Sequence, residues 1–491
     1  MSFSEKMREY IKNAIIGILL LILICLFVIY ILAFSGVSAY EFSKDDMEAV
    51  SSESVQYQYL DYWDISFASP SFIGFSAKAY GDNIGFYTLG GENADIYAEI
   101  LPFLDQLLSR NGIVERLEEK KGLEMFHSLL KGDYIYLSYA CDLPTSFILA
   151  MAKDDAVFDG YMGQYVSEIL IVPEHHLWVA EMETASGYPQ HRDCYSFYAV
   201  ARDREGNYYR YSPSLMPTKQ KDLTFHTNFY QTYNTSEQAM SYEFACLWKT
   251  DGFFEQYGFS EKVSDTTVIS FDHSAYTAPI VFAETRIPNG ADMDAVLEAF
   301  FMNPEMVSSY IDENGTVFYF DEGRNLSVSS SGKLAYTAPD VGGISLETLF
   351  GWHTSGHEYS IFDYLGASLV AGNQMQNAYT KTNCHRYISD ISYDGSTLTI
   401  SFGYASAGLP LYFNGNASVM SFSFSGGRIR EAEYHFWTIH QTANMAGAPD
   451  FLWALRSYLL KSEQICDYIY GYHFSKNQTR CGMEIIEKPL P

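Results

Sequence analysis

The chain has 491 residues and a formal net charge of −29, with 60 acidic side chains against 31 Lys and Arg. This acidity disfavours binding to nucleic acid and to anionic lipid head groups, because both repel a negative surface. Hydrophobic residues make up 47% of the sequence and aromatic residues 16%, a composition that excludes a largely disordered chain and indicates buried cores.

Residues 14–34 form an uninterrupted apolar segment, AIIGILLLILICLFVIYILAF, without a charged side chain. At about 1.5 Å per residue, a helix of this length matches the roughly 30 Å hydrocarbon core of a bilayer. Residues 1–13 carry three basic side chains, whereas the first base after the segment is Lys44. This asymmetry predicts a single-pass anchor in the cell membrane, with a cytoplasmic N-terminus and the bulk of the chain extracellular.

Two alternatives to a permanent anchor stay open. Val37-Ser38-Ala39 offers a signal peptidase small residues for cleavage before Tyr40, although the apolar segment exceeds the usual h-region of about 7–15 residues. A lipoprotein signal requires a small residue before Cys25, where the chain has Ile24. We therefore predict that the segment is retained and that Cys25 faces lipid or a partner helix.

The exterior part divides into three ranges: an N-terminal α+β domain (40–217), a connecting segment without clear periodicity (218–264) and a C-terminal α+β region (265–491). In the first range, apolar residues from Ile96 to Leu108 predict a helix that Pro102 kinks or divides. Asp142 and Pro144 mark the start of a short helix. The predicted strands are residues 134–139, 167–172, 177–181, 194–200 and 208–211, and a helix is predicted around residues 236–247.

In the C-terminal region, one helical face contains Met293, Val296, Leu297, Phe300 and Phe301. A meander of alternating strands follows, and a helical stretch from Leu346 precedes a second meander. The predicted strands are residues 316–320, 325–329, 333–336, 398–404, 411–413, 419–424, 429–436 and 465–472, with a helix at 451–460. This order predicts two similar halves of antiparallel sheet packed with helices, each sheet having one wet face.

Two histidine motifs match the spacing of metal ligands. His353 and His357, followed by Glu358, would share one face of a helix, but Gly356 favours a loop and the order is not HExxH. His175-His176 lies beside a predicted strand, where neighbouring side chains point to opposite faces. Neither motif predicts a metal site.

Ser330 and Lys333 match the SxxK spacing of acyl-serine enzymes that act on cell walls. That chemistry requires a serine at the start of a helix, whereas this tetrapeptide is predicted to be a hairpin turn. We therefore predict no catalytic residue, no cofactor and no enzymatic activity. The six exterior cysteines are widely spaced, which leaves a bridge between Cys466 and Cys481 open.

Three stretches carry a resemblance to a known family. They are AFFMNPEMVSSYIDENGTVFYFDEGRNLSVSSSGKLAYTAP (299–339), ISYDGSTLTISFGYASAGLPLYFNGNASVMSFSFSGGRI (391–429) and LRSYLLKSEQICDYIYGYHF (455–474). With the single anchor ahead of a large exterior part, they resemble the YycH/YycI family, extracytoplasmic regulators of the WalK cell-wall sensor kinase in Gram-positive bacteria. The ending Lys488-Pro489-Leu490-Pro491 lacks the tryptophan-containing finish of that family.

The resemblance implies a regulator without catalysis. Its partners would be a two-component sensor histidine kinase and a second YycH/YycI-like protein, contacted through the membrane helix and the outer domains. Two alternatives stay open. A surface module could bind cell-wall glycan or peptide through tyrosine-rich strands, since the chain has 40 tyrosines, or a cell-wall hydrolase could assemble its site from distant residues.

Overall fold

In the computed structural model the described residues are 65–76, 83–108, 112–151, 163–179, 191–213, 242–247, 268–271, 277–321, 323–339, 342–350, 359–379, 382, 384–447, 467–474, 480–481 and 483–488. All of them belong to one compact unit, residues 58–491. The predicted membrane segment at residues 14–34 lies outside them. Within the described ranges, no helix has both the length and the apolar character needed to cross a membrane.

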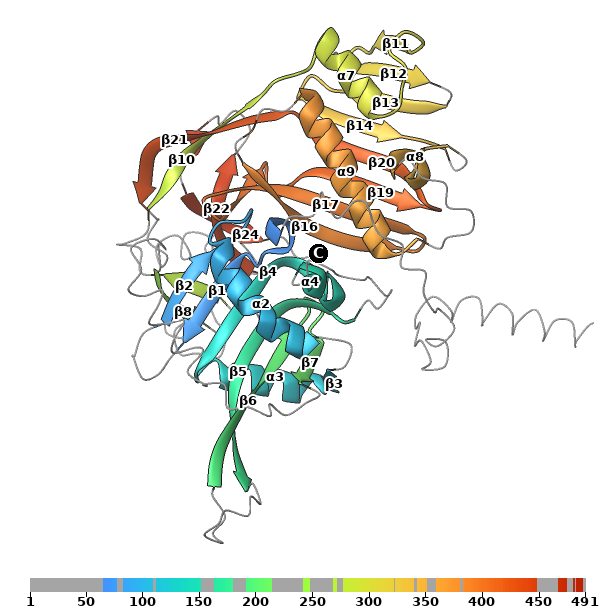
Figure 1. The fold of residues 1–491 in the computed structure, drawn as a ribbon. Coiled ribbons are helices and arrows are strands. Elements are labelled where there is room, and N and C mark those ends of the chain that lie inside the picture. Colours follow the sequence, from blue (N-terminus) through green and yellow to red (C-terminus); the bar gives the residue numbers. More distant parts are fainter. Residues whose placement is uncertain are drawn as a thin grey trace, which may run out of the picture. The chain divides into compact units, whose positions relative to one another are not determined.

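The first large sheet has nine strands, and each neighbouring pair is antiparallel (Figure 1). The strands are β1 (Phe72–Ser76), β2 (Asn83–Tyr87), β3 (Ile113–Leu117), β4 (Tyr134–Pro144), β5 (Tyr165–Val179), β6 (His191–Arg202), β7 (Tyr208–Ser212), β8 (Tyr242–Leu247) and β9 (Val268–Phe271). Their order is β3-β7-β6-β5-β4-β1-β2-β8-β9. The central strand β1 is buried at all five positions, as expected where both faces are covered.

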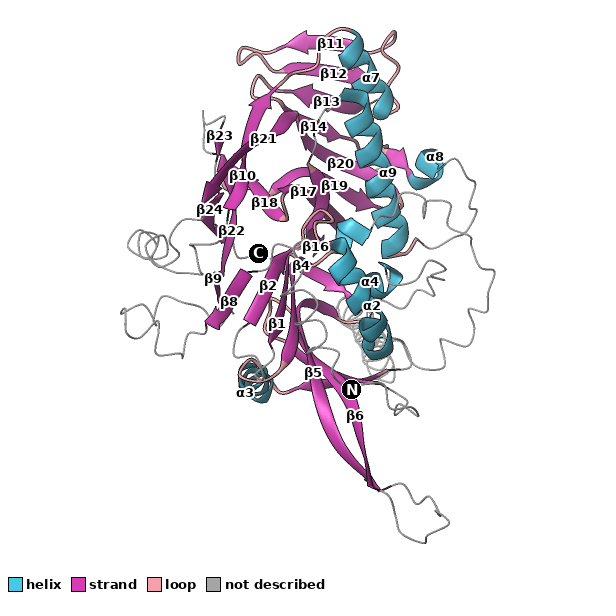
Figure 2. Ribbon diagram, turned by 60° about the vertical axis from the view of Figure 1, so that its left-hand side comes forward, coloured by secondary structure: helices cyan, strands magenta, loops and turns pink. Residues whose placement is uncertain are grey.

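Helices cover both faces of this first sheet (Figure 2). α2 (Ala94–Leu108) packs on one face, where the ring of Phe103 lies 5.4 Å from that of Phe197 in β6. α3 (Glu119–Leu129) packs on the other face, where Phe126 lies 6.1 Å from Tyr208 of β7. α4 (Thr145–Met151) follows β4 and contacts both α2 and η2 (Ile65–Ala68). The side chains on the two faces of the sheet therefore form two separate cores.

α2 is one continuous helix that contains Pro102, so the alternative of two separate helices is wrong. Ile96, Ile100 and Leu104 are fully buried at spacings of four residues, so the apolar periodicity identified the correct face. Pro102 lies on the exposed side, where water can bind the carbonyl that proline leaves without an N–H donor.

A buried ion pair lies on the α3 face of the sheet. Arg202 of β6 donates from Nε to Glu168 Oε2 at 2.8 Å and from Nη2 to Glu168 Oε1 at 2.7 Å. The two side chains are only 7% and 9% exposed, and the guanidinium lies 5.3 Å from the ring centre of Phe126. The ion pair thus links β5, β6 and α3. Removing either of its two side chains would leave the charge of the other in the core.

The second large sheet has twelve strands. They are β11 (Ser308–Ile311), β12 (Val317–Asp321), β13 (Arg324–Val328), β14 (Lys333–Thr337), β15 (Ile344–Ser345), β16 (His385–Asp394), β17 (Thr397–Ser406), β18 (Leu409–Phe413), β19 (Ser418–Ser425), β20 (Arg428–His435), β22 (Asp467–Phe474) and β24 (Met483–Lys488). The two predicted meanders join edge to edge where β14 pairs with β20. In the described residues, β18 with β22 is the one parallel pair.

Helices α7 (Ala291–Ala299) and α9 (Ile361–Tyr379) contact each other and cover one face of the second sheet (Figures 1 and 2). Cross-strand partners on this face are mostly apolar: Tyr319, Leu326, Tyr336, Ala432, Phe422 and Ile400. The neighbouring row on the opposite face is mostly polar: Phe320, Asn325, Thr337, Glu431, Ser423 and Thr399. This confirms the predicted division into a helix-covered face and a wet face.

A third, three-stranded sheet contains β10 (Thr277–Thr285) between β21 (Trp437–Gly447) and β23 (Arg480–Cys481). A short helix, α8 (Leu346–Phe350), contacts α9. The architecture is therefore mostly antiparallel sheet with a few helices, as the α+β prediction states.

Some predicted boundaries were wrong for physical reasons. The strands predicted at 167–172 and 177–181 are one strand, β5, although Pro173 interrupts its pattern. Pairing with β4 ends at Ile171, so Pro173 lies where β5 has only β6 as a neighbour and its missing N–H costs no ladder bond. Within the helix predicted around 236–247, residues 242–247 form β8, which pairs with β2, and residues 236–241 lie outside the described ranges.

The predicted helical face at residues 293–301 is right for its first four members only. α7 ends at Ala299, and Phe301 has a positive φ of 55° and is 37% exposed. The strand β11 that follows was not predicted, because all four of its residues are exposed and no apolar alternation marks it. The helix predicted at 451–460 lies outside the described residues.

Replacing Arg202 by Leu should lower the free energy of unfolding by about 3–5 kcal/mol, because Glu168 would remain charged and buried without its partner. Urea unfolding of the full chain in detergent, followed by circular dichroism, measures the loss. The double variant E168L/R202L should recover most of it, since both charges are then removed.

The matched control is the ion pair of Lys121 with Glu118, whose side chains are 77% and 68% exposed. Replacing Lys121 by Leu should change the stability by less than about 1 kcal/mol. Equal losses in the single Arg202 variant and in the double variant would show that packing, and not the buried charge, determines the effect.

Candidate functional site

The two large sheets meet between β4 and β16. Leu89, which follows β2, forms an antiparallel bridge with Gly408 in the turn between β17 and β18. The thiol of Cys141 in β4 lies 3.7 Å from the carbonyl oxygen of Ile388 in β16. Segments that are far apart in the sequence are thus held together by contacts to backbone atoms.

Glycines make this close approach possible. Gly408 has a φ of +75°, and a Cβ atom there would lie 2.5 Å from the carbonyl oxygen of Tyr87. At Gly403 a Cβ atom would lie 2.7 Å from the phenol oxygen of Tyr387. Tyr387 is buried with Leu89 and Ala405, and its ring fills the space that Gly403 leaves.

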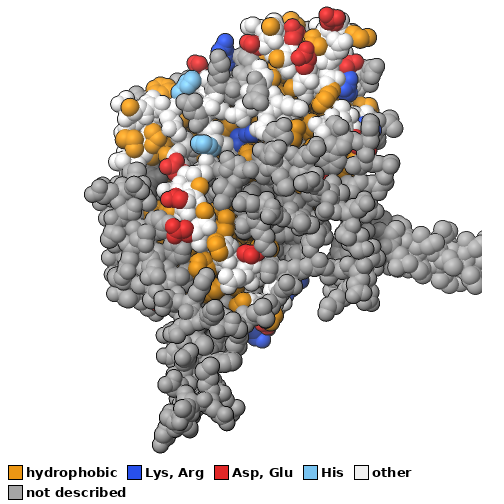
Figure 3. Space-filling model, in the orientation of Figure 1, with side chains coloured by type: hydrophobic (Ala, Val, Ile, Leu, Met, Phe, Trp, Pro, Cys, Tyr) orange, Lys and Arg blue, Asp and Glu red, His pale blue; other side chains and the backbone are white. Residues whose placement is uncertain are grey.

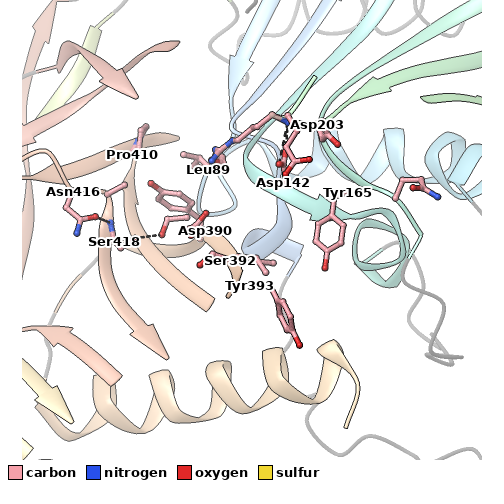
Figure 4. Close-up of a pocket in the computed structure, with 18 of the residues that line it drawn as sticks. Leu89, Asp142, Tyr165, Asp203, Asp390, Ser392, Tyr393, Pro410, Asn416 and Ser418 are labelled. Atoms are coloured by element: carbon pink, nitrogen blue, oxygen red, sulfur yellow. Dashed lines mark hydrogen bonds between the residues drawn. The ribbon is translucent and has the colours of Figure 1, made fainter. Parts of the chain in front are cut away.

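A cleft of about 760 Å³ opens beside this junction (Figure 4). One wall comes from β4, the start of β5 and the turn between β6 and β7, and the other comes from β16, β18 and the start of β19. Figure 4 shows Asp142, Tyr165 and Asp203 on the first wall and Asp390, Asn416 and Ser418 on the second. This is the size range of a site for a small ligand or a short peptide.

The first wall is held by carboxylates that accept backbone hydrogen bonds. Asp142 Oδ1 accepts the N–H of Arg204 at 3.1 Å, and Arg204 also donates from Nη2 to the carbonyl of Ala140. Asp203 accepts the N–H of Asn207 at 2.8 Å and its Nδ2 at 2.7 Å. The turn between β6 and β7 is therefore fixed in place by acids that also line the cleft.

Burial raises the pKa of the Asp142 carboxyl above its usual value, and this effect outweighs the attraction of Arg204. The nearby charge of Asp203 raises the same pKa further. Burial also raises the pKa of Tyr165, with smaller contributions from Asp142 and from Tyr393 on the opposite wall. On the first wall, Asp142 is therefore electrostatically coupled to Tyr165, and Tyr165 is in turn coupled to Tyr393 on the opposite wall.

The second wall is neutral at its base and acidic at Asp390. Ser389 and Ser418 share a hydrogen bond of 3.0 Å between their hydroxyl groups. Asn416 Oδ1 accepts the N–H of Ser418 at 2.8 Å, which fixes the start of β19. At the rim, Tyr165 and Tyr393 are 38% and 70% exposed. They present aromatic surface that a ligand can cover.

The arrangement suits recognition by hydrogen bonding and stacking. Carboxylate oxygens and hydroxyl groups can accept and donate bonds to a sugar or to an amine, while tyrosine rings pack on an apolar face. In the described ranges, no three His, Cys, Asp or Glu side chains lie in an arrangement that could hold a metal ion.

The structure shows where some of the sequence motifs lie. Residues 330–333 lie in the hairpin between β13 and β14, where Gly332 N–H bonds to Ser329 O at 3.0 Å, as predicted. His175 and His176 are successive residues of β5, paired with Tyr195 and Cys194. Residues 351–358, with His353, His357 and Glu358, lie outside the described ranges.

Cys141, Cys384 and Cys481 are buried thiols. The Cys481 thiol donates to the carbonyl of His473 at 3.1 Å, while Cys466 lies outside the described residues. Burial raises the pKa of Cys384 to about 11, so this thiol is a poor nucleophile at neutral pH.

No protein-family model, no curated protein and no solved structure matches this chain.

The cleft residues were not predicted from the sequence as a group. Asp142 was predicted to mark the start of a short helix, but it lies in β4, and α4 begins three residues later at Thr145. The available signal was the acidic cluster Asp203-x-Glu205, which becomes a site only when β16 lies opposite.

Replacing Asp142 by Asn should raise the free energy of unfolding at neutral pH. Because the pKa of Asp142 is higher in the folded state, its carboxyl favours the folded state below the unfolded-state pKa of 3.8. This contribution to stability is lost as the pH rises through the folded-state pKa. Urea unfolding across pH should show the variant more stable than the wild type at pH 7, with the difference disappearing in acid. The same change at Asp394, an exposed residue, is the control. An Asp142 variant that is less stable at pH 7 would show that its hydrogen bonds outweigh its burial.

Replacing Gly408 by Ala should destabilise the junction by about 1–3 kcal/mol, from left-handed backbone strain and the clash with Tyr87. Gly415 is the matched control, because its φ is +84° but no atom lies within 4 Å of the added Cβ. Urea unfolding should show a smaller loss for Gly415→Ala. Equal losses would contradict a close approach at Gly408.

Proposed function

We propose that this protein is a membrane-anchored extracytoplasmic regulator that acts by association with a sensor histidine kinase controlling cell-wall metabolism. The apolar segment at residues 14–34 and the basic residues before it support the anchor and its orientation. The stretches that resemble the YycH/YycI family support the kinase as partner. A second protein of this kind would be a further partner outside the membrane.

The observation that carries the binding role is the preformed cleft between the two large sheets. Asp142 and Asp203 already accept backbone hydrogen bonds from their own wall, so they fix its shape. The serine hydroxyls of the opposite wall bond to each other. A pre-organised surface of this kind supports recognition, because its groups need not reorganise when a partner binds.

Regulation also requires that the protein bind one state of the kinase more tightly than the other. A single spanning helix can select between kinase states through the fit of its side chains against neighbouring helices. Gly17 is the one glycine within the apolar segment, and no GxxxG pattern is present, so the pairing would depend on the order of large aliphatic residues.

A surface module for wall glycan or peptide is the second candidate, and the rim of the cleft favours it. Tyr165 and Tyr393 offer exposed rings on facing walls, with carboxylates and hydroxyl groups beside them. Sugars bind such surfaces by stacking on the rings and by hydrogen bonding to the acids.

The proposal is tested by co-purifying the full-length chain with the kinase from detergent-solubilised membranes. We expect the kinase to be retained, and we expect retention to fall severalfold when the order of residues 14–34 is shuffled at constant composition. The shuffled segment still spans the bilayer, so a loss reports side-chain fit and not tethering.

Two results would contradict the proposal. One is a mature protein that starts at Tyr40 and is found in the medium. The other is retention of wall glycan, but not of kinase, that is lost on replacing Tyr165 and Tyr393 by Ala. The latter result would establish the glycan module instead.

A further inference from the structure

Three aromatic side chains gather at one end of the second sheet, on the face that α7 does not cover. Tyr310 of β11 lies 4.9 Å from Phe318 and 5.6 Å from Phe320, both in β12, with ring planes within 10° of parallel. Tyr319, between the two phenylalanines, lies in the cross-strand row of Leu326 and Tyr336, and the Tyr336 ring stacks on Phe300 at the end of α7, so this row is on the helix side. Phe318 and Phe320 therefore point to the wet face, where the other strands carry polar residues.

This β11 aromatic cluster is exposed. Tyr310 is 52% exposed and Phe320 38%, and Phe318 between them is half-buried. An apolar group of this kind at one point of an otherwise polar sheet face is unusual for a surface that meets only water.

The same end of the sheet is an open edge. Among the described residues, β11 pairs with β12 alone. Asp312 N–H bonds to Thr316 O at 2.9 Å, and hydrogen-bonded pairs alternate along an antiparallel ladder. The backbone groups of Ser309 and Ile311 therefore point away from β12. β11 contains no proline, no charge and no bulge, which are the devices that usually protect an edge from a further strand.

The surroundings of this edge are strongly acidic. Residues 291–324 contain eight acidic side chains and a single basic one, Arg324. Arg324 is already bonded to Asp321 at 2.6 Å and to the carbonyl of Phe301 at 3.0 Å. The space-filling view shows acidic and hydrophobic side chains side by side at this end of the molecule (Figure 3). A basic segment would meet complementary charge here.

We infer that β11 binds an extended, net-basic segment of a partner protein, which adds to the sheet as a strand and packs its apolar side chains on the β11 aromatic cluster. Backbone hydrogen bonds to Ser309 and Ile311 would supply affinity, and the aromatic rings would select alternate apolar side chains. Acidic residues around the edge would attract the lysines or arginines between them. This surface is separate from the cleft and does not depend on which kinase the protein contacts.

A second copy of this chain is a poorer occupant. Self-pairing of β11 would bring together two ends that each carry the same excess of acidic residues. Like charges across a strand pair are destabilising, and the net charge of −29 adds to the repulsion.

The test uses the full-length protein in detergent and a short fluorescent peptide that alternates lysine and valine, with binding measured by anisotropy. Ser309→Pro removes an N–H that faces the open edge and leaves the bonds to β12, so the affinity should fall at least about tenfold. Ser309→Ala keeps that N–H and should bind like the wild type. Tyr310→Ser should also weaken binding about tenfold, whereas Ile113→Ser, at a residue of β3 in the first sheet that is 60% exposed, should not.

Two peptide controls separate the contributions. A peptide that alternates glutamate and valine should bind far more weakly, and raised salt should weaken the lysine peptide. Equal affinity of the Ser309→Pro and Ser309→Ala variants would overturn strand addition, and equal affinity of both peptides would overturn the charge argument. A wild-type dimer that Ser309→Pro converts to a monomer would assign the edge to a second copy and overturn the inference. Circular dichroism verifies that each variant is folded.

Discussion

The arrangement of the folded part rests on one close backbone approach, between Gly408 and the residues that end β2. No side chain other than hydrogen fits at residue 408, and the bridge to Leu89 forms because none is present. Tyr387 then closes the junction by packing over Gly403 and against Leu89. Both walls of the cleft extend from this point. The position of the acidic wall relative to β16 therefore depends on glycine contacts, although the glycines have no reactive side chains.

Local periodicity predicted the elements whose burial is determined within one segment. The apolar stripe of α2 and the alternation of β13 and β14 are examples, since the buried face of a helix or strand appears in the sequence as a regular spacing of apolar residues. Elements that lack such spacing, or that depend on a distant neighbour, were missed or misread. β11 has no buried residue, β8 is a strand because β2 offers it an edge, and β5 continues through Pro173 because β4 has ended.

The cleft could not be predicted for the same reason. Its residues come from short pieces of β4, β5, β16, β18 and β19 and from the turn between β6 and β7, and each piece has an ordinary local role. Asp142 bonds the backbone of Arg204, and Asp203 bonds Asn207, as turn-forming aspartates do in many proteins. Long-range contacts, among them the pairing of Leu89 with Gly408 and the contact of β4 with β16, bring these groups opposite Asp390, and no pattern in one sequence encodes that distance.

The parallel pairing of β18 with β22 has a consequence for biogenesis. Leu411 lies opposite Tyr472, and β18 also supplies Pro410 and Tyr412 to the cleft. A chain that leaves the ribosome or a translocation channel from its N-terminus presents β18 well before β22 emerges. During that interval β18 has an unsatisfied edge, open to chaperones and to proteases, and the sheet matures only when its last strands arrive. Nascent chains truncated before β22 should therefore be cleared by quality control even though most of both sheets has already been made.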